Sequence, residues 1–367
     1  MNVFYDHTIF QQFYGGISRY FREVVARLLD EEDVSVHLFM GFFMNRYGLE
    51  SLKGRCKAYW GRPAFPLPRA GRAIRLLNRV MWRLFQVRFA PGGGKGAVYH
   101  PTYYDFSGLS KAKVVFTVHD FTHERFPRLF PKGDRTPALK RKAFSRADTL
   151  ICVSKSTKND LLSFYGAQCP IKAIHHGYND LSALPTPDLT LPDYPYFLFV
   201  GPRHAYKNFG RLLAALASSA ELKNNFGVAC FGGTPFSATE KRRFTELGLA
   251  NRIVRYDGND NALSGLYKNA LALVFPSFYE GFGFPILEAM SCGCPVVASG
   301  VSSIPEVSGN AALLFNPSSA EELAEQLRKV AFKNDLRFRL IELGKRRCAL
   351  FSWERCVKET LEFYRSL

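Results

Sequence analysis

Two glutamates that lie close together in the sequence are the strongest candidates for a functional site. Glu280 follows an apolar run, 270–275, and Glu288 comes eight positions later. Between them stand Gly281, Phe282, Gly283 and Phe284. Pro285 follows, and because proline suits the first turn of a helix, the amides of 281–284 would lie at a helix start, which favours an anion. Carboxylates repel phosphate but accept hydrogen bonds from hydroxyls, so a phosphorylated sugar or ribose is indicated. The alternative is two solvated acids that bind nothing.

A second group of residues supplies positive charge. The strand-like run 196–200 ends at Gly201, and Arg203 and Lys207 follow within seven residues. Gly201 would let a ligand approach the strand end. Arg203, as a two-pronged fork, and Lys207, as a point charge, can neutralise a diphosphate. The chain has no Asp-x-Asp motif to hold a divalent ion, so we expect these cations to replace a metal. The alternative is a pair of solvated surface cations.

Two weaker signals lie in the first half of the chain. Gly15 and Gly16 stand between the first strand-like run and the first helical pattern. They permit close backbone approach to a phosphate or sugar, although the spacing is not that of a dinucleotide fingerprint. His119, followed by Asp120, ends the β-branched run 114–119, where parallel sheets bind ligands. A plain tight turn and a structural histidine are the alternatives.

Strand-like and helix-like segments alternate along the chain, which predicts an α/β fold with parallel sheets. A Pro- and Asp-rich stretch, 182–195, predicts a linker between one domain at 1–181 and another at 196–352. A last amphipathic helix is expected at 353–367, and Ser154 is the expected N-cap of another helix. Strands are expected at 2–6, 34–39, 98–100, 114–119, 149–153, 196–200, 227–231, 253–256, 270–275 and 295–298.

The formal net charge of +17 is the unusual feature of the composition. Such an excess of Lys and Arg indicates an anionic partner, which can be a phosphorylated substrate, an acidic membrane surface or nucleic acid. The chain has no apolar run long enough to span a membrane and no signal-peptide pattern at its start, so a cytoplasmic protein is expected. Its eight cysteines include no C-x-x-C pair, so we expect reduced thiols and no metal site.

The segment 68–90 combines basic and apolar residues at helical spacing. Its arginines spread over most of the helix surface, and its apolar face is expected to contain Ile74, Leu77, Met81, Trp82 and Phe85. A basic amphipathic helix that carries Trp and Phe suits an anionic membrane surface. The alternative is a helix that packs on its own domain with its arginines in solvent.

Together these residues resemble the family 4 glycosyltransferases, which are retaining enzymes of GT-B architecture. The signature glutamates of that family have the spacing of Glu280 and Glu288, and the segment 201–208 is similar to its diphosphate clamp. Residues 175–178 resemble the segment before its domain linker. The first half carries the resemblance only at 15–16, 119–120 and 153–155.

The resemblance implies two doubly wound, Rossmann-like domains that face a central cleft, with the acceptor bound by the first and the nucleotide sugar by the second. The helix at 353–367 would cross back onto the first domain. Glu288 would bind the ribose and Glu280 the transferred sugar, with the amides of 282–284 on sugar or phosphate. Arg203 and Lys207 would stabilise the leaving diphosphate. Gly16 would lie against that diphosphate, and His119 would contact the sugar.

The resemblance further implies transfer of a hexose to a saccharide or lipid-linked saccharide in bacterial cell-surface polysaccharide synthesis, without a cofactor. GDP-mannose is the first donor to expect, followed by UDP-hexoses and dTDP-rhamnose. Membrane docking through 68–90 would hold the enzyme on the inner face of the cytoplasmic membrane. A phosphorylase or a nucleotide-sugar epimerase on the same scaffold is the alternative. Nucleic-acid binding is suggested by charge alone, since no RRM, KH or zinc-finger signature is present.

Overall fold

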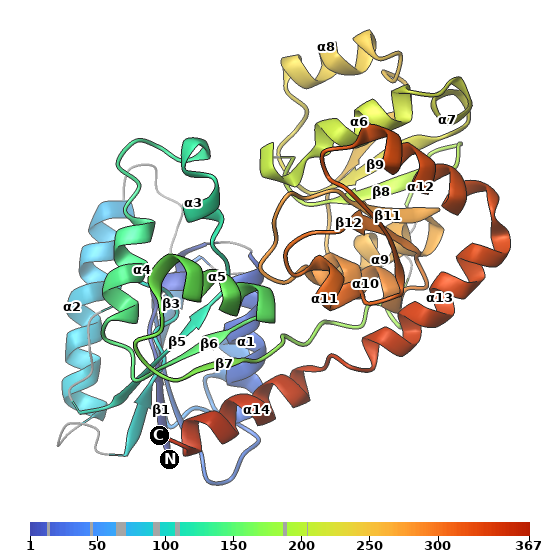
Figure 1. Ribbon diagram of the computed structural model, residues 1–367. Helices are drawn as coiled ribbons and strands as arrows, with labels where there is room; N and C mark the ends of the chain where they lie inside the picture. The colour runs from blue at the N-terminus through green and yellow to red at the C-terminus, as the bar shows by residue number, and fades with distance from the viewer. Residues whose placement is uncertain are drawn as a thin grey trace. The chain divides into compact units, whose positions relative to one another are not determined.

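A computed structural model describes residues 1–12, 15–44, 47–63, 71–90, 96–106, 111–185, 189–203 and 205–367. The chain forms two compact units: Met1–Gly177 together with Trp353–Leu367, and Tyr178–Ser352. Each unit is built on one parallel β-sheet flanked by helices (Figure 1). The predicted α/β class with two doubly wound, Rossmann-like domains is therefore confirmed.

The first unit has a seven-stranded sheet in the order β3-β2-β1-β4-β5-β6-β7. Its strands are β1 (Asn2–Tyr5), β2 (Ser35–Phe43), β3 (Ala58–Pro63), β4 (Ala97–Tyr99), β5 (Lys113–Val118), β6 (Thr149–Cys152) and β7 (Ile171–Ala173). Its helices are α1 (Gly16–Leu28), α2 (Gly71–Phe89), α3 (Thr122–Arg125), α4 (Thr136–Phe144), α5 (Lys155–Tyr165) and α14 (Trp353–Arg365). Ser154 caps α5 as predicted, because its hydroxyl accepts a hydrogen bond from the Thr157 amide.

The second unit has a six-stranded sheet in the order β10-β9-β8-β11-β12-β13. Its strands are β8 (Tyr196–Val200), β9 (Gly227–Phe231), β10 (Ile253–Tyr256), β11 (Ala272–Phe275), β12 (Val296–Ser299) and β13 (Ala312–Phe315). Its helices are α6 (Phe209–Ala217), α7 (Ala220–Asn225), α8 (Ala238–Glu246), α9 (Asp260–Asn269), α10 (Phe284–Ser291), α11 (Ile304–Ser308), α12 (Ala320–Phe332) and α13 (Asn334–Cys348). Three strands that the sequence did not predict, β3, β7 and β13, all lie at the edge of a sheet.

The last helix, α14, belongs to the first unit although it follows the second unit in sequence (Figure 1). The Tyr364 hydroxyl lies 3.2 Å from that of Tyr5 and also hydrogen-bonds to Nδ1 of His100. Nε2 of His100 in turn lies 2.9 Å from the Thr117 hydroxyl. All four side chains are buried, so this network ties α14 to β1, β4 and β5. Burial also lowers the pKa of His100 to about 3, so the ring is neutral there.

The stretch 182–195 is not a free linker. The chain passes from the first unit to the second between Gly177 and Tyr178, and the described residues beyond that point pack on the second unit. The Lys268 ammonium donates to the carbonyl of Leu184 at 2.9 Å, and the Tyr256 hydroxyl donates to that of Thr190 at 3.0 Å. Residues 186–188 lie outside the described part of the chain.

Helix α2 covers one face of the first sheet, and α1 with α14 covers the other. Alternate residues of β1 point to the two faces, as strand geometry requires. Phe4 shares a cluster with Trp82 of α2, whereas Tyr5 contacts Phe21 of α1 with ring centroids 6.0 Å apart. None of the described helices is long and apolar enough to cross a membrane.

The predicted apolar face of α2 is right only in part. Trp82 and Phe85 are buried as predicted, but Leu77 is exposed, and the fully buried Asn78 lies on the inner face instead. The Asn78 side chain accepts from the Phe42 amide at 2.7 Å and donates to the Phe42 carbonyl at 3.2 Å. A second, outward stripe of apolar side chains was not predicted: Leu76, Val80, Leu84 and Val87, which are between 49% and 78% exposed. Residues 68–70 of the predicted segment lie outside the described residues.

Candidate functional site

The second sheet brings the two strongest groups of sequence candidates together. Strands β8 and β11 are neighbours, and their order marks the point where the crossovers leave the sheet in opposite directions. The carboxyl ends of the strands at such a point are the usual ligand site of an open parallel sheet. The loop after β8 carries Lys207, and the loop after β11 carries Glu280. The amide of Phe278 donates to the carbonyl of Tyr206 at 2.8 Å, so the two loops run side by side.

Asn208 fixes the end of the loop that carries Lys207. Its backbone is left-handed, with φ of 58° and ψ of 33°, a conformation that asparagine tolerates better than most residues. Its side-chain amide donates to the carbonyl of Pro276 at 3.0 Å and to that of Pro317 at 2.8 Å. One buried side chain therefore joins three loops at the carboxyl edge of the sheet.

Lys207 and Glu280 form an ion pair at this edge. The lysine ammonium lies 2.7 Å from Oε1 and 2.9 Å from Oε2 of the glutamate. The two side chains are only 14% and 12% exposed, and the ammonium lies 5.6 Å from the centre of the Phe275 ring. The alternative of a solvated loop acid is therefore wrong for Glu280. Because the pair is neutral as a whole, a carboxylate can stand beside a phosphate site without repelling its ligand.

Two serines that follow strand β12 hold the loop between β11 and α10 through hydrogen bonds. The Glu280 amide donates to the Ser302 hydroxyl at 3.0 Å. The buried Ser303 hydroxyl lies 2.9 Å from the Glu280 carbonyl and 3.0 Å from that of Phe282, so its proton is shared by two acceptors. Gly283, with φ of 107°, precedes the first residue of α10. The predicted helix start near Pro285 is confirmed, with the amide-bearing residues Gly281, Phe282, Gly283 and Phe284 at that start.

Glu288 lies one turn inside α10 and is only 3% exposed, so it is not a solvated helix acid. The Tyr267 hydroxyl, from α9, lies 3.4 Å from its Oε2. Burial, reinforced by the charge of Glu288, raises the pKa of Tyr267 well above its usual value, so the phenol stays protonated. A buried carboxylate is a strong acceptor for ligand hydroxyls.

Arg203 does not present the open fork that its position in the sequence suggested. Its side chain is buried, its Nε donates to Glu240 of α8 at 2.6 Å, and its Nη2 donates to the Thr234 carbonyl at 2.6 Å. The guanidinium also stacks 4.6 Å from the centre of the Phe236 ring. Burial would raise the pKa of Glu240, but the contact with Arg203 lowers it overall. Only Nη1 has no hydrogen-bond partner among the described residues.

Two of the sequence candidates in the first unit lie at the start of α1. Gly16 is the first residue of the helix, and the Gly15 carbonyl accepts from the amide of Arg19 at 3.1 Å. The Gly15 amide donates to the Tyr47 hydroxyl at 3.2 Å. A Cβ at Gly15 would come within 2.7 Å of the end of the flexible Gln12 side chain, which would have to move aside. Residues 13–14 lie outside the described residues.

His119 directly follows β5 and is a neutral, buried histidine. Burial lowers its pKa to about 3; the negative charge of Asp120 opposes this shift and Lys140 adds to it. The ring packs edge-on against Tyr20, with centroids 5.3 Å apart, and its Nε2 has no hydrogen-bond partner among the described residues. His119 can therefore form one hydrogen bond with a ligand, but it cannot act as a cation near neutral pH.

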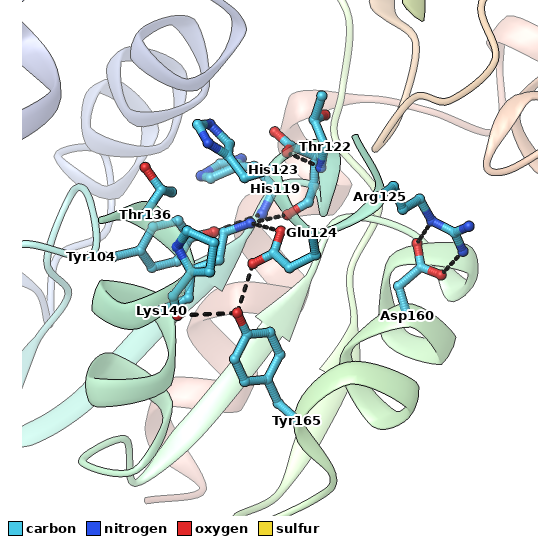
Figure 2. A network of polar contacts seen from close by, with 12 residues as sticks. Tyr104, His119, Thr122, His123, Glu124, Arg125, Thr136, Lys140, Asp160 and Tyr165 are labelled. Atoms are coloured by element: carbon cyan, nitrogen blue, oxygen red, sulfur yellow. Dashed lines mark hydrogen bonds and ion pairs between the residues drawn. The ribbon is translucent and has the colours of Figure 1, made fainter. Parts of the chain in front are cut away.

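A buried network that the sequence did not reveal holds the loop after His119 (Figure 2). The Lys140 ammonium donates to the Asp120 carbonyl at 2.7 Å and to Glu124 at 2.9 Å. The Tyr165 hydroxyl donates to the other oxygen of Glu124 at 2.7 Å. These contacts join α4 and α5 to the loop. No sequence signal marks them, because the partners come from separate helices.

The described residues contain no group of three or more His, Cys, Asp or Glu side chains that could hold a metal ion. The ends of β8 and β11 carry the Lys207–Glu280 pair, and Glu288 lies one turn inside the helix that follows β11. Such a set suits a ligand that carries both phosphate and hydroxyl groups.

Two family models match the chain one after the other. Residues 14–180 match the model described as Glycosyltransferase Family 4, and residues 187–347 match Glycosyl transferases group 1. Together they span most of both units. The chain therefore belongs to this family of glycosyltransferases, as its motifs implied.

Among its relatives, O-antigen chain mannosyltransferase B of Escherichia coli is 28% identical over 380 residues, which cover 96% of each chain. O-antigen chain mannosyltransferase RfbU of Salmonella typhimurium is 26% identical over 58% of this chain and 60% of its own. The fold matches the solved structure of HepE from Anabaena in complex with UDP and glucose. Its TM-score is 0.74 at 18% identity, over 100% of this chain and 99% of that one.

Substitution of Ser303 tests whether its hydroxyl holds the loop that carries Glu280. We expect Ser303→Ala to leave two buried carbonyls short of a donor and to destabilise the loop by about 1–2 kcal/mol. Hydrogen–deuterium exchange of peptides that cover 278–284 should then become roughly tenfold faster.

Ser308 is the matched control, because it is equally buried in the same unit and its hydroxyl has no partner among the described residues. Ser308→Ala should leave exchange at 278–284 unchanged. Equal protection in the Ser303 variant and the wild type would show that this serine does not hold the loop.

Proposed function

We propose that this glycosyltransferase moves a hexose, with mannose as the first candidate, from a nucleotide-diphosphate sugar to a saccharide acceptor in surface polysaccharide synthesis. The observation that carries the proposal is the Lys207–Glu280 pair at the carboxyl ends of β8 and β11, followed by the buried Glu288 on α10. The names of the O-antigen mannosyltransferases support mannose as the transferred sugar and a polysaccharide acceptor. The UDP complex of the HepE structure supports a nucleotide site in this fold.

In this proposal the ligand's polar groups divide among three parts of the site. Glu288 accepts hydrogen bonds from the ribose hydroxyls, and Glu280 accepts them from the transferred sugar. Lys207 contacts the diphosphate, since an ammonium can turn an N–H toward a phosphate oxygen while it keeps its carboxylate partner. The start of α10, with the partial positive charge of a helix N-terminus, would attract the phosphate group in this scheme.

The reaction breaks the bond between the sugar's anomeric carbon and the diphosphate oxygen and forms one to an acceptor oxygen. Negative charge grows on the leaving diphosphate, and Lys207 with the helix start stabilises it. The departing oxygen takes the acceptor's proton on the same face of the sugar, so the configuration is retained. No metal is needed in this scheme, because a side-chain cation occupies the position where the charge develops.

The remaining candidates receive smaller roles. Arg203 uses two donor groups on Glu240 and Thr234, so we propose that it fixes the loop after β8 and offers only Nη1 to a phosphate. His119 offers one hydrogen bond of a neutral imidazole to a sugar hydroxyl. Gly15 and Gly16 admit a phosphate or sugar close to the backbone at the start of α1.

The acceptor is proposed to be lipid-linked, with α2 resting on an anionic membrane surface. The four residues of the outward stripe, Leu76, Val80, Leu84 and Val87, recur at helical spacing on the face opposite Trp82. The arginines Arg75, Arg79 and Arg83 flank that stripe. An apolar stripe flanked by arginines is complementary to a surface of anionic lipids.

Substitution of Lys207 tests the chemical step. Lys207→Ala should slow turnover by roughly 10²–10³-fold at saturating donor, because it removes charge stabilisation from the leaving group. Arg203→Ala should slow it by only about tenfold, because two of its three nitrogens already donate to groups within the protein. Nucleotide release is the assay, with thermal unfolding to show that each variant is folded.

Lys268→Ala, an exposed lysine of the same unit that donates to the Leu184 carbonyl, is the control and should keep full activity. Wild-type turnover in the Lys207 variant would refute its role on the diphosphate.

The donor base and the need for a metal can be tested together by thermal shift in EDTA. We expect GDP at 100 times its dissociation constant to stabilise the protein by about 2.7 kcal/mol, and UDP and dTDP to do less. Glu288→Gln should lose most of the shift, since an amide is a weaker acceptor for the ribose hydroxyls. A shift that requires added divalent ion would overturn metal independence, and a larger shift with UDP would overturn the choice of guanine.

Membrane docking predicts preferential binding to vesicles of phosphatidylglycerol over vesicles of phosphatidylcholine. Replacing Leu76, Val80 and Leu84 together by serine should weaken co-sedimentation with the anionic vesicles at least tenfold without unfolding the protein, because all three side chains are exposed. Phe338→Ser, an exposed phenylalanine on α13, is the control. Equal binding of the wild type to both kinds of vesicle would contradict the proposal.

A further inference from the structure

A pocket lies at the carboxyl edge of the first sheet. It has a volume of about 250 Å³ and is lined by residues that follow β1, residues that follow β4 and one side of α2. In the strand order of this sheet, β1 and β4 stand where the crossovers part, as β8 and β11 do in the second sheet. A crevice at such a point is the usual ligand site of an open parallel sheet.

Three arginines, Arg75, Arg79 and Arg83, form one wall of this pocket. They are four residues apart, so they stand above one another on a single side of α2. Arg79 pairs with Asp105 at 2.6 Å. Arg75 and Arg83 have no carboxylate partner among the described residues. Two uncompensated guanidinium groups therefore face the same small volume.

The one other carboxylate of the pocket, that of Asp6, is already fully used. It is buried and accepts hydrogen bonds from the Tyr99 hydroxyl at 2.8 Å and from the Thr102 hydroxyl at 2.6 Å. The amides of Thr8 and Thr102 also donate to it, at 3.1 and 3.2 Å. These four donors spread its charge into the protein, so it competes little for the arginines.

His7 adds a polar group that lacks a partner. The side chain is only 7% exposed and lines the pocket, and its Nδ1 has no hydrogen-bond partner among the described residues. Burial lowers the pKa of the ring; the charge of Asp6 opposes this and that of Arg79 adds to it, so the imidazole is neutral. A buried, unpaired ring nitrogen is costly unless a ligand or water supplies the missing hydrogen bond.

We infer that this pocket binds the phosphate group of a phosphorylated acceptor, with Arg75 and Arg83 on the phosphate and His7 on a neighbouring hydroxyl. Guanidinium groups match phosphate oxygens in pairs, and the neutral ring matches a hydroxyl. This inference rests on the proposed transferase function and gives the acceptor its chemical class, an ester of phosphate or diphosphate.

The position of the pocket favours a lipid-linked ester over a free sugar phosphate. The arginine side of α2 adjoins the outward stripe of Leu76, Val80, Leu84 and Val87 on the same helix. An apolar lipid chain would lie along that stripe while its diphosphate enters the pocket. A free phosphate ester would use the arginines alone.

Calorimetric titration in the presence of saturating GDP, which occupies the proposed donor site, tests the pocket. The probes are farnesyl diphosphate, inorganic pyrophosphate and glycerol 1-phosphate. Farnesyl diphosphate should bind most tightly, and the double variant Arg75→Gln/Arg83→Gln should weaken its binding at least tenfold. Asp105→Asn should strengthen it several-fold because it releases Arg79, a gain that a merely structural role would not produce.

Arg88→Gln is the matched control, since it removes the same charge from α2 outside the pocket lining. GDP affinity should be equal in the wild type and in every variant, so loss of GDP binding would count against the donor site and not against this pocket. Tighter binding of pyrophosphate than of farnesyl diphosphate would overturn the lipid-linked acceptor. Unchanged binding of all three probes in the double variant would overturn the pocket itself.

Discussion

The strand order of the two sheets is the constraint on which the sites depend. In each sheet the first strand stands between the second and the fourth, so the connections on its two sides must leave toward opposite faces. The connections that follow β8 and β11 therefore diverge at the carboxyl ends of these strands, and so do those that follow β1 and β4. In the second sheet this parting brings Lys207 within 2.7 Å of Glu280, a residue 73 positions away. Polar side chains can gather there without breaking either hydrophobic core.

The Lys207–Glu280 pair is better explained by binding than by stability. Both side chains are mostly withdrawn from water, and the cost of removing two charges from solvent offsets much of their attraction. What the pair provides is a neutral surface with an ammonium on one side and carboxylate oxygens on the other. A ligand that carries phosphate next to hydroxyls meets the matching group at each point. Ser303 and Asn208 donate buried hydrogen bonds to loop carbonyls, and these bonds fix the conformation of the loops that form that surface.

What the sequence could predict depended on how far apart the interacting residues lie. The strand, the glycine loop and the start of α10 follow each other directly, so Glu280, Gly283 and the helix start near Pro285 were predictable from local spacing. The ion pair of Arg203 with Glu240 was not, because it joins two segments whose meeting is decided by the sheet. The contribution of Ser303 was hidden for the same reason. Edge strands such as β3 and β7 were missed because, at the margin of the sheet, they carry weaker apolar patterns.

Helix α2 shows how one helix can pack on its own domain and still expose apolar side chains. A helix of this length presents several separate sides, and here each carries its own chemistry. Asn78, Trp82 and Phe85 pack on the sheet, so the segment does belong to its own domain. The arginines occupy a second side, toward the pocket, and the outward apolar stripe occupies a third. From composition alone, this segment can be predicted only to be a basic amphipathic helix. The sheet decides which side is buried, and that choice leaves the arginines between a polar crevice and an apolar surface, the boundary at which a lipid phosphate is stable.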